Sequence, residues 1–320
     1  MDRRTLLRIS SVALLPQLAV AQPRAGRIVV PFPAGGATDI VARLLADPLA
    51  RELAHPIVVD NRAGAGGSLG MAEVARAAPD GLTLGIATVS THGVNPVVYR
   101  QLPYDPLTDF TPIAELVRAP GVMVVHPGVP ARTFPDFLAH LKAHPGKLSY
   151  GSPGHGSTGH MAGEIFKAST HTFIVHIPYR GAAAMLTDLI GGRIQVASDQ
   201  LASALPHIRA GRLRPLAVSW HTRLAQLPDV PTFAELKLPA NNEPSWFGLV
   251  APAGLPPEKV RTLHAAARRS LAVSEVKARI EQLGLFAADS SPEEFGRRIR
   301  GEIERMQRVA RLAKLVLDAP

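Results

Sequence analysis

Two glycine-rich loops carry the residues that could do chemistry in this chain of 320 residues. Residues 27–39 (R-I-V-V-P-F-P-A-G-G-A-T-D) read as a short apolar strand, a glycine turn and a helix that opens at Thr38 or Asp39. Residues 154–159 (G-H-G-S-T-G) also lie between an expected strand and an expected helix. Such a turn directs several backbone N–H groups to one point, and a helix N-terminus attracts anions. The two loops therefore predict capture of a small anion.

The second loop also matches the G-x-G-x-x-G pattern of dinucleotide-binding sites. Such a site needs an acidic residue about 20 positions further on. The sequence there, residues 176–180 (H-I-P-Y-R), contains no acid. We therefore interpret the loop as an anion nest, formed by backbone N–H groups with the hydroxyls of Ser157 and Thr158.

Residues 66–70 (G-G-S-L-G) fit the nucleophile-elbow pattern, which offers a competing function as an exported serine hydrolase with Ser68 as nucleophile. The preceding residues 61–65 (N-R-A-G-A) read as a loop, and Ser68 stands where a helix N-cap belongs. We predict a cap and no catalytic residue.

The twelve histidines raise a third possibility, a metal-binding uptake receptor. His140 and His144 are four residues apart on an expected helix, and four more histidines follow at positions 155, 160, 171 and 176. A zinc site needs three or four converging ligands, whereas these histidines fall on different expected elements. We predict no metal site and no cofactor.

Two acidic residues lie at positions where a ligand could meet them. Asp39 could face a ligand from the first loop, although an Asp at a helix start is ordinarily a cap. Asp199 ends an expected strand, and open α/β sheets bind ligands at that edge.

The elements that must position these residues alternate between strand and helix. The first run contains strands at 27–32, 56–60 and 82–88 and helices at 38–53 and 67–77, with a kink or break expected at Pro48. The second run contains strands at 147–151, 173–179, 194–199 and 213–219 and helices at 133–144, 157–168, 181–190 and 201–210. Alternation of this kind predicts parallel sheets with helices on both faces. The two runs therefore predict two lobes, each with one glycine loop facing a shared cleft.

The remaining segments connect or cover these lobes. Residues 111–126 and 246–252 read as extended crossings between the lobes, and a helix at 257–272 follows. A last helix at 292–317 has one apolar stripe, which we expect to pack on the first lobe.

Composition and charge describe an ordinary globular protein, with 46% hydrophobic and 19% charged residues and a net charge of +9. The basic residues are scattered and aromatic residues make up only 5%, which argues against nucleic-acid binding. The N-terminus has Arg3-Arg4, an apolar segment at 9–20 and small residues up to Ala21, the layout of a signal peptide. We predict export, with cleavage near Ala21, by either the general secretory or the twin-arginine route.

An ordered series of motifs carries a family resemblance. It begins with V-P-F-P-A-G-G-A-T-D at 30–39, N-R-A-G-A-G-G at 61–67 and L-P-Y-D-P at 102–106, and continues with P-G-K-L-S-Y at 145–150 and H-I-P-Y-R-G at 176–181. L-P-D-V-P-T at 227–232 and W-F-G at 246–248 complete it. The chain resembles the substrate-binding proteins of tripartite tricarboxylate transporters, the Bug-type receptors, over essentially its whole mature length.

The resemblance implies a two-lobed α/β periplasmic-binding-protein fold of type II-like form, with a mostly parallel sheet in each lobe and a hinge between them. It implies a signal peptide at 1–21, lobe one at 22–122, lobe two at 123–226 and a return to lobe one at 227–320. The implied function is capture of a small carboxylate in the periplasm and delivery to membrane permease subunits, without catalysis and as a monomer.

In this family, backbone N–H groups of the glycine loops typically hold one ligand carboxylate. The residues that the resemblance nominates in lobe one are Phe32, Ala34, Gly35, Gly36, Thr38, Asp39, Ser90 and Thr91. Those in lobe two are Ser152, Gly154, His155, Ser157, Thr158, Tyr179, Arg180 and Asp199. Gln200 stands where an Asn is frequent, a difference that could alter ligand choice.

Overall fold

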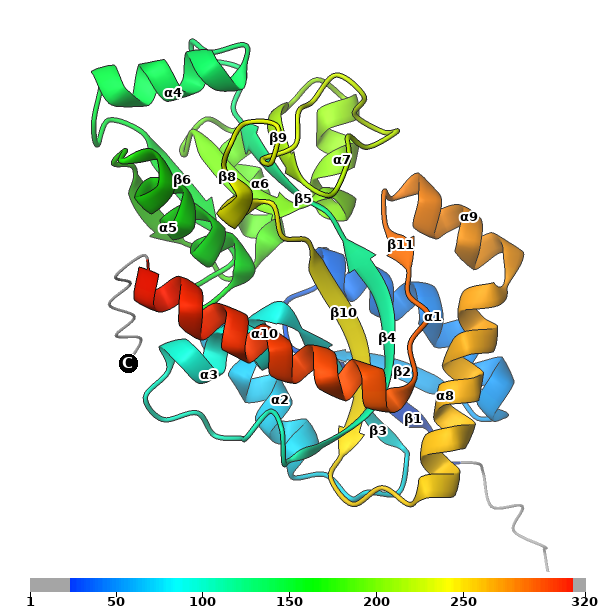
Figure 1. Cartoon of the computed structure of the whole chain (residues 1–320). Coiled ribbons are helices and arrows are strands. Elements are labelled where there is room, and N and C mark those ends of the chain that lie inside the picture. Colours follow the sequence, from blue (N-terminus) through cyan, green and yellow to red (C-terminus); the bar gives the residue numbers. More distant parts are fainter. Residues whose placement is uncertain (1–23, 313–320) are drawn as a thin grey trace, which may run out of the picture.

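The computed structural model describes residues 24–312, which form two α/β lobes side by side (Figure 1). The first lobe is built on a six-stranded sheet with the order β11-β4-β10-β3-β1-β2. Its strands are β1 (Gly26–Val30), β2 (Ile57–Asn61), β3 (Thr83–Thr88), β4 (Phe110–Ala119), β10 (Ser245–Pro252) and β11 (Phe286–Ala287). β1 runs parallel to β2 and β3, whereas β10 runs antiparallel to β3 and β4.

Helices cover both faces of the first sheet. They are α1 (Ala37–Leu53), α2 (Ser68–Ala75), the single turn α3 (Asn95–Val98), α8 (Pro257–Ala272), α9 (Ser274–Gln282) and α10 (Pro292–Leu312). Alternate residues of β1 show the two-sided burial. Ile28 packs in the core that includes α1 and α8, and Val29 packs in the core that includes α2 and α10. Burial on both faces explains the apolar runs in the central strands β1 and β10.

The second lobe is built on a five-stranded sheet with the order β7-β6-β8-β5-β9. Its strands are β5 (Gly121–Val125), β6 (Ser149–Ser152), β7 (Val175–Pro178), β8 (Val196–Gln200) and β9 (Arg214–Ser219). Its helices are α4 (Phe134–Ala143), α5 (Thr158–Thr170), α6 (Ala182–Ile190) and α7 (Leu201–Arg209). The core again has two halves, one with α6 and α7 and one with α4 and α5.

The chain crosses between the sheets at two places. Only Pro120 separates β4 from β5, and residues 220–244 lead from β9 back to β10. The predicted fold class, two α/β lobes with sheets flanked by helices, is confirmed. Both sheets are mixed, however, because the strands on either side of the crossings run antiparallel to their neighbours.

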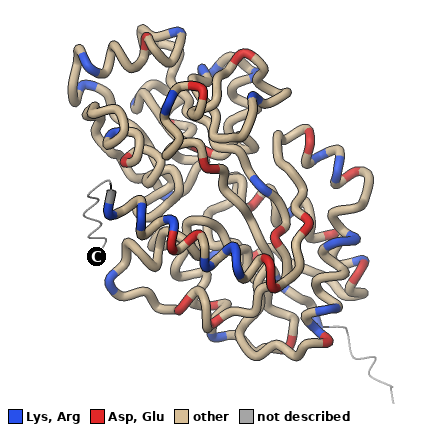
Figure 2. The backbone as a smooth tube through the Cα atoms, viewed as in Figure 1, with Lys and Arg blue, Asp and Glu red and all other residues tan. Residues whose placement is uncertain are grey.

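Two helices illustrate what local sequence decides. α1 continues through Pro48 without the break that was one expected outcome, and Pro48 is buried. α10 buries the predicted stripe of Phe295, Ile299, Ile303 and Met306 against the first lobe. Figure 2 shows basic and acidic residues interspersed along its outer face.

Within the described range no helix combines the length and apolar character needed to cross a bilayer. The signal peptide predicted at 1–21 lies outside that range.

Candidate ligand-binding site

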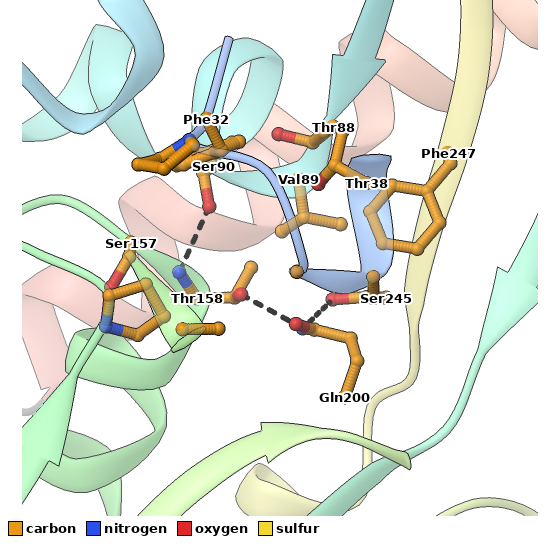
Figure 3. Close-up of a pocket in the computed structure, with 15 residues that line it drawn as sticks. Phe32, Thr38, Thr88, Val89, Ser90, Ser157, Thr158, Gln200, Ser245 and Phe247 are labelled. Atoms are coloured by element: carbon orange, nitrogen blue, oxygen red, sulfur yellow. Dashed lines mark hydrogen bonds between the residues drawn. The ribbon is translucent and has the colours of Figure 1, made fainter. Parts of the chain in front are cut away.

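The N-termini of three helices meet at a cavity between the lobes (Figure 3). Gly36 caps α1 and Ser157 caps α5, and both line the cavity, as does Ala182 at the start of α6. The complete lining is Phe32, Pro33, Gly36, Ala37, Thr38, Thr88, Val89, Ser90, Pro153, Ser157, Thr158, Ala182, Gln200, Ser245 and Phe247. We call this space the inner cavity. Its volume is about 40 Å³, room for roughly three water molecules.

The helix starts leave backbone donors without helical partners. In α1 the first intrahelical bond runs from Ile40 N to Gly36 O at 3.0 Å, so the N–H groups of residues 37–39 have no carbonyl within the helix. In α6 the first bond runs from Met185 N to Gly181 O at 3.3 Å, which leaves residues 182–184 in the same condition. Positive partial charge therefore accumulates at the cavity from both lobes.

Hydroxyl groups add donors that are already oriented. Ser90 Oγ accepts the Thr158 N–H at 3.0 Å, while Thr158 Oγ1 and Ser245 Oγ accept from Gln200 Nε2 at 3.1 and 3.2 Å. None of the three hydroxyls donates a hydrogen bond to another described residue, so each keeps a proton to offer. Of the described residues that line the cavity, none is charged. The arrangement suits an anion held by N–H and O–H donors without an ion pair.

Hydrogen bonds also join the lobes across the cavity. The bond from Thr158 N to Ser90 Oγ links α5 to the π-turn η2 (Ser90–Val94) of the first lobe. Tyr99 donates its hydroxyl to His155 O at 3.3 Å, a second link between lobes. These two bonds tie η2 and Tyr99 of the first lobe to the second glycine loop and the start of α5.

A larger groove continues outward from the inner cavity, and both are lined by Phe32, Pro33 and Pro153. This outer groove has a volume of about 600 Å³. Four residues nominated from the sequence line it on the side of the second lobe: Gly154, His155, Tyr179 and Arg180. Arg180 is exposed, whereas the Tyr179 hydroxyl is bound to Asp188 Oδ2 at 3.0 Å.

Asp39 is turned away from the inner cavity and holds its own loop together. Its carboxylate accepts bonds from Gly35 N at 3.0 Å, Arg43 Nε at 2.9 Å and Asn61 Nδ2 at 3.0 Å. Burial alone would raise the pKa of Asp39, but the bonds from Arg43, Gly35 and Asn61 outweigh it, and the pKa is lower than usual. Gly35 adopts φ +87°, which suits glycine and aims its N–H at Asp39.

The sixteen nominated residues divide into three groups. Those that line the inner cavity are Phe32, Gly36, Thr38, Ser90, Ser157 and Thr158. Those on the outer groove are Phe32 again with Gly154, His155, Tyr179 and Arg180. Ala34, Gly35, Asp39, Thr91, Ser152 and Asp199 line neither space. Thr91 and Ser152 are buried beneath the loops, where Thr91 Oγ1 bonds to Thr88 and Ser152 Oγ bonds to Gly154 O.

Sequence reasoning missed two lining residues from the return strand, Ser245 and Phe247. They precede and follow Trp246 at the start of β10, so the W-F-G motif marked the place without indicating which side chains face the cavity. Asp199 lines a second small cavity by the lobe crossing, which shares Thr158, Gln200 and Ser245 with the inner cavity. Burial raises its pKa to about 6, against the lowering effect of bonds from Ser203 and Gln200.

Ser68 does not resemble a nucleophile. It is the first residue of α2, and the residue that caps the helix is Gly67, so the predicted N-cap is displaced by one position. The Ser68 hydroxyl is buried and donates to Ala65 O at 2.6 Å. Among the described residues, no histidine forms a hydrogen bond with it.

The histidines depart from the sequence-based expectation. His155, His160 and His176 lie on different elements, as predicted, yet their ring nitrogens lie within 4.8 Å of one another. The premise that different elements keep them apart is wrong, because parallel pairing of β6 with β7 brings His176 beside the start of α5.

Solved structures of similar proteins match this fold closely. A protein described as a periplasmic transporter aligns with a TM-score of 0.90 and 44% identity, over 92% of this chain and 98% of that one. Rpa4515 of R. palustris with adipate aligns with a TM-score of 0.88 and 37% identity, over 91% of this chain and 98% of that one. MatC of Rhodopseudomonas palustris with bound malate aligns with a TM-score of 0.86 and 33% identity, over 90% of this chain and 99% of that one. The fold and its interlobe cavity therefore define a two-lobed solute-binding protein.

Sequence comparison identifies the family. Residues 41–315 match the model of the tripartite tricarboxylate transporter family receptor. The chain is 34% identical over 286 residues to BugT of Bordetella pertussis, which covers 89% of this chain and 88% of BugT. The protein belongs to this family of transport receptors and is of the Bug type.

Proposed function

We propose that this protein captures a small carboxylate in the inner cavity and delivers it to the membrane permease of a tripartite tricarboxylate transporter. The observation that carries the proposal is the convergence of three helix N-termini on a cavity whose described lining is uncharged. Two similar proteins whose structures contain adipate and malate add support for a carboxylate ligand.

In this proposal the carboxylate lies against the start of α1. The carboxylate accepts hydrogen bonds from the backbone N–H groups of residues 37 and 38. The hydroxyls of Thr38 and Ser90 also donate to it, from the same side. Thr158 and Ser245 complete the shell with the protons that their existing bonds leave free. Each such bond in a closed, water-poor site is worth about 1.5–3 kcal/mol when its acceptor is ionised.

The cavity volume indicates how the ligand is arranged. Room for roughly three waters accepts a carboxylate and its neighbouring carbon, so the rest of the ligand passes Pro33 and Pro153 into the outer groove. There the exposed Arg180 is available to a second anionic group. We therefore propose a ligand with two acidic ends, or one acidic end and a longer polar body.

The proposed transport role also leads us to propose a location, a signal-peptide cleavage site and a movement of the lobes. We propose that the chain is exported to the periplasm, that cleavage occurs near Ala21, and that lobe one (22–122 and 227–320) and lobe two (123–226) close as units around the ligand. Hydroxyl groups such as those of Thr38 and Ser90 line the inner cavity, but its described lining contains no histidine, acid or lysine that could act as their general base. We propose binding without catalysis, by a monomer.

The test is a titration of tag-free mature protein that has been unfolded, dialysed and refolded to remove any ligand. Mono-, di-, tri- and aromatic carboxylates are compared with their methyl esters by thermal shift and calorimetry. We expect at least one carboxylate to bind and its ester to fail. At 100 times Kd the free energy of unfolding rises by about 2.7 kcal/mol. Binding of no carboxylate, or equal binding of the ester, would contradict the proposal.

Matched variants locate the site. Thr38→Val removes a cavity hydroxyl at nearly constant shape, and we expect affinity to fall at least about tenfold, in line with about 1.5–3 kcal/mol for a bond to an ionised acceptor. Thr262→Val is the control, since its hydroxyl donates to Glu258 O on the surface of α8, far from the loops. Equal affinities of the two variants would place the carboxylate elsewhere.

A further inference from the structure

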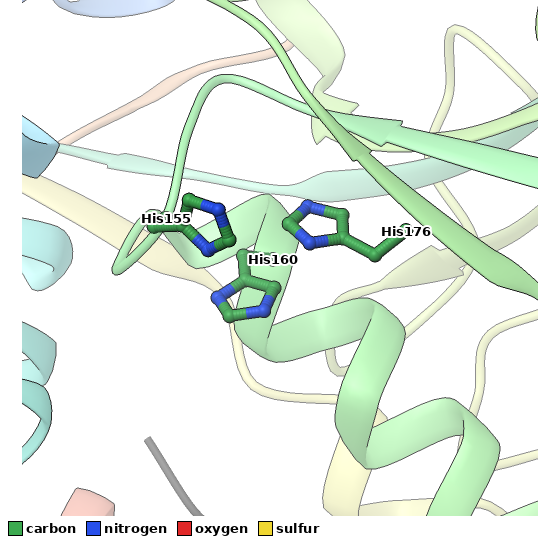
Figure 4. Close-up of side chains that lie close together, drawn as sticks. All are labelled: His155, His160 and His176. Atoms are coloured by element: carbon green, nitrogen blue, oxygen red, sulfur yellow. The ribbon is translucent and has the colours of Figure 1, made fainter. Parts of the chain in front are cut away.

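Three histidines of the second lobe form a compact cluster at the edge of the outer groove (Figure 4). His155 comes from the loop after β6, His160 from the first turn of α5 and His176 from β7. One ring nitrogen from each lies within 4.8 Å of the other two. The set combines an exposed, a buried and a half-buried side chain, so it is both built into the lobe and open to solvent.

The surrounding residues hold two of the rings in place. His176 stacks between Tyr150 and His160, with ring centroids 4.7 and 4.2 Å away. Its Nε2 lies 2.7 Å from Ser152 Oγ, and Ser152 also bonds to Gly154 O at 3.1 Å. If Ser152 donates to Gly154, His176 donates its Nε2 proton to Ser152, which leaves Nδ1 with a free lone pair. A hydrogen bond of this kind on one ring nitrogen is how metal-binding histidines are usually oriented.

The cluster also favours the neutral state that metal ligands require. The pKa of His160 is lowered to about 4 and that of His176 to about 3. Burial is the largest cause for both, the neighbouring histidines and Lys167 contribute to the same shift, and Glu164 opposes it at His160. The charged groups nearby are Glu164 and Lys167, which pair with each other at 2.9 Å. Glu164 is also bound by the Tyr150 hydroxyl, so its negative charge is largely satisfied.

We propose that His155, His160 and His176 form a binding site for a divalent first-row transition-metal ion, with Zn²⁺ as the probe. Three imidazole nitrogens on a tetrahedral zinc are about 3.4 Å apart, since each Zn–N bond is about 2.0–2.1 Å. The cluster must therefore contract by up to about 1.4 Å, and the stacked rings must turn so that their lone pairs converge. His155 is exposed and on a loop, so it supplies most of the contraction, whereas His160 and His176 rotate about their side-chain bonds. The fourth position stays open to the outer groove, where water completes the tetrahedron.

The site would tie β7 to the loop that carries Pro153, Ser157 and Thr158, all of which line the inner cavity. Its ligands are separate from the residues that line the inner cavity, so the two sites can be measured independently. Carboxylate binding in the presence of a chelator reports on the inner cavity, and metal binding without carboxylate reports on the histidine cluster.

The experiment uses tag-free mature protein, stripped with a chelator and kept at one neutral pH. Co²⁺ is added first, because its visible absorption reports tetrahedral coordination, and Zn²⁺ is then used to displace it. We expect one equivalent to bind per chain with a tetrahedral spectrum. His155→Ala, at the exposed ligand, should weaken Zn²⁺ binding at least about tenfold without changing the thermal unfolding of the metal-free protein.

The control addresses the other histidine pair. His140 and His144 lie four residues apart on α4 with ring centroids 4.5 Å apart, and such a pair can hold a metal without the cluster. The double variant His140→Ala/His144→Ala should keep the site. His176→Gln, which retains a polar group beside Ser152, should lose it. Loss of binding in the double variant alone, or no saturation at about millimolar metal, would overturn the proposal.

Discussion

Asp199 makes the stability of this protein depend on pH in an unusual direction. It is the penultimate residue of β8 and has only 3% of its surface exposed, and Ser203 donates to its Oδ2 at 2.6 Å. Its Oδ1 has no hydrogen-bond partner among the described residues. Because burial disfavours the ionised form, the pKa of Asp199 rises from 3.8 to about 6. The folded state therefore keeps a proton that the unfolded chain releases.

The sign and size of the effect follow from linkage. Between pH 3.8 and about 6 the folded state binds more protons than the unfolded state, so stability is highest below this window and is lost as pH rises through it. At about 1.4 kcal/mol per pH unit, a difference of about 2.2 between the two pKa values gives about 3 kcal/mol. Asp199→Asn keeps the shape and the acceptor for Ser203 but abolishes the titration. It should therefore be more stable than the wild type by about 3 kcal/mol above pH 6 and by little near pH 4.

Urea unfolding of both proteins from pH 4 to 7.5 measures this difference, with free energies from linear extrapolation. Asp136→Asn is the control of opposite sign. Hydrogen bonds from Thr133 lower the pKa of Asp136, so its contribution is lost only below pH 3.8 and its offset from wild type should be constant over the range. Parallel curves for the Asp199 variant and wild type would refute the reasoning and show that Oδ1 has an unseen partner, such as a buried water.

Three further substitutions test the first glycine loop, the turn η2 and strand β10. Gly35→Val forces a branched side chain into φ +87° and should weaken carboxylate binding at least about tenfold in calorimetry; normal binding would mean that the first loop is not part of the site. Ser90→Ala removes the bond to the second lobe and one donor to the ligand, so ligand dissociation in stopped flow should become at least about tenfold faster. Gly248→Ala would place a Cβ 2.0 Å from the ring of Phe295 and should destabilise the fold by about 1–3 kcal/mol or more in urea unfolding. Gly301→Ala, with nothing near its Cβ, is the glycine control: it should leave binding intact and, inside helix α10, raise stability by about 0.5–1 kcal/mol.

Most elements were predictable because their signals are local. The strand and helix around the second glycine loop, now β6 and α5, follow from an apolar run, glycine punctuation and a Ser at the helix cap. α9 and β11 were missed. α9 is a short, highly charged helix, and β11 is a two-residue strand that exists only through its pairing with β4. Neither has a periodic pattern long enough to read.

The loop residues show a sharper limit. The sequence placed glycines, Thr38 and Asp39 at a helix start, which is sufficient to predict an anion site. The sequence could not show that the Asp39 side chain turns away from the inner cavity and accepts bonds from the Gly35 N–H and Arg43. This orientation depends on a third bond, from Asn61 at the end of β2. Ser245 was also beyond reach, since the return strand meets the cavity only after the chain has crossed between the lobes.

The amino-acid sequence by itself determined the two alternating α/β runs, the two glycine loops between strand and helix, and the family to which their ordered motifs belong. These properties depend on neighbours within about twenty residues, so composition and spacing carry them. Only the tertiary structure decided which donors remain free at the inner cavity and which histidines meet. Both depend on long-range register, such as the pairing of Tyr150 with His176 across β6 and β7. That register is set by the packing of whole sheets and helices, and no short stretch of the chain encodes it.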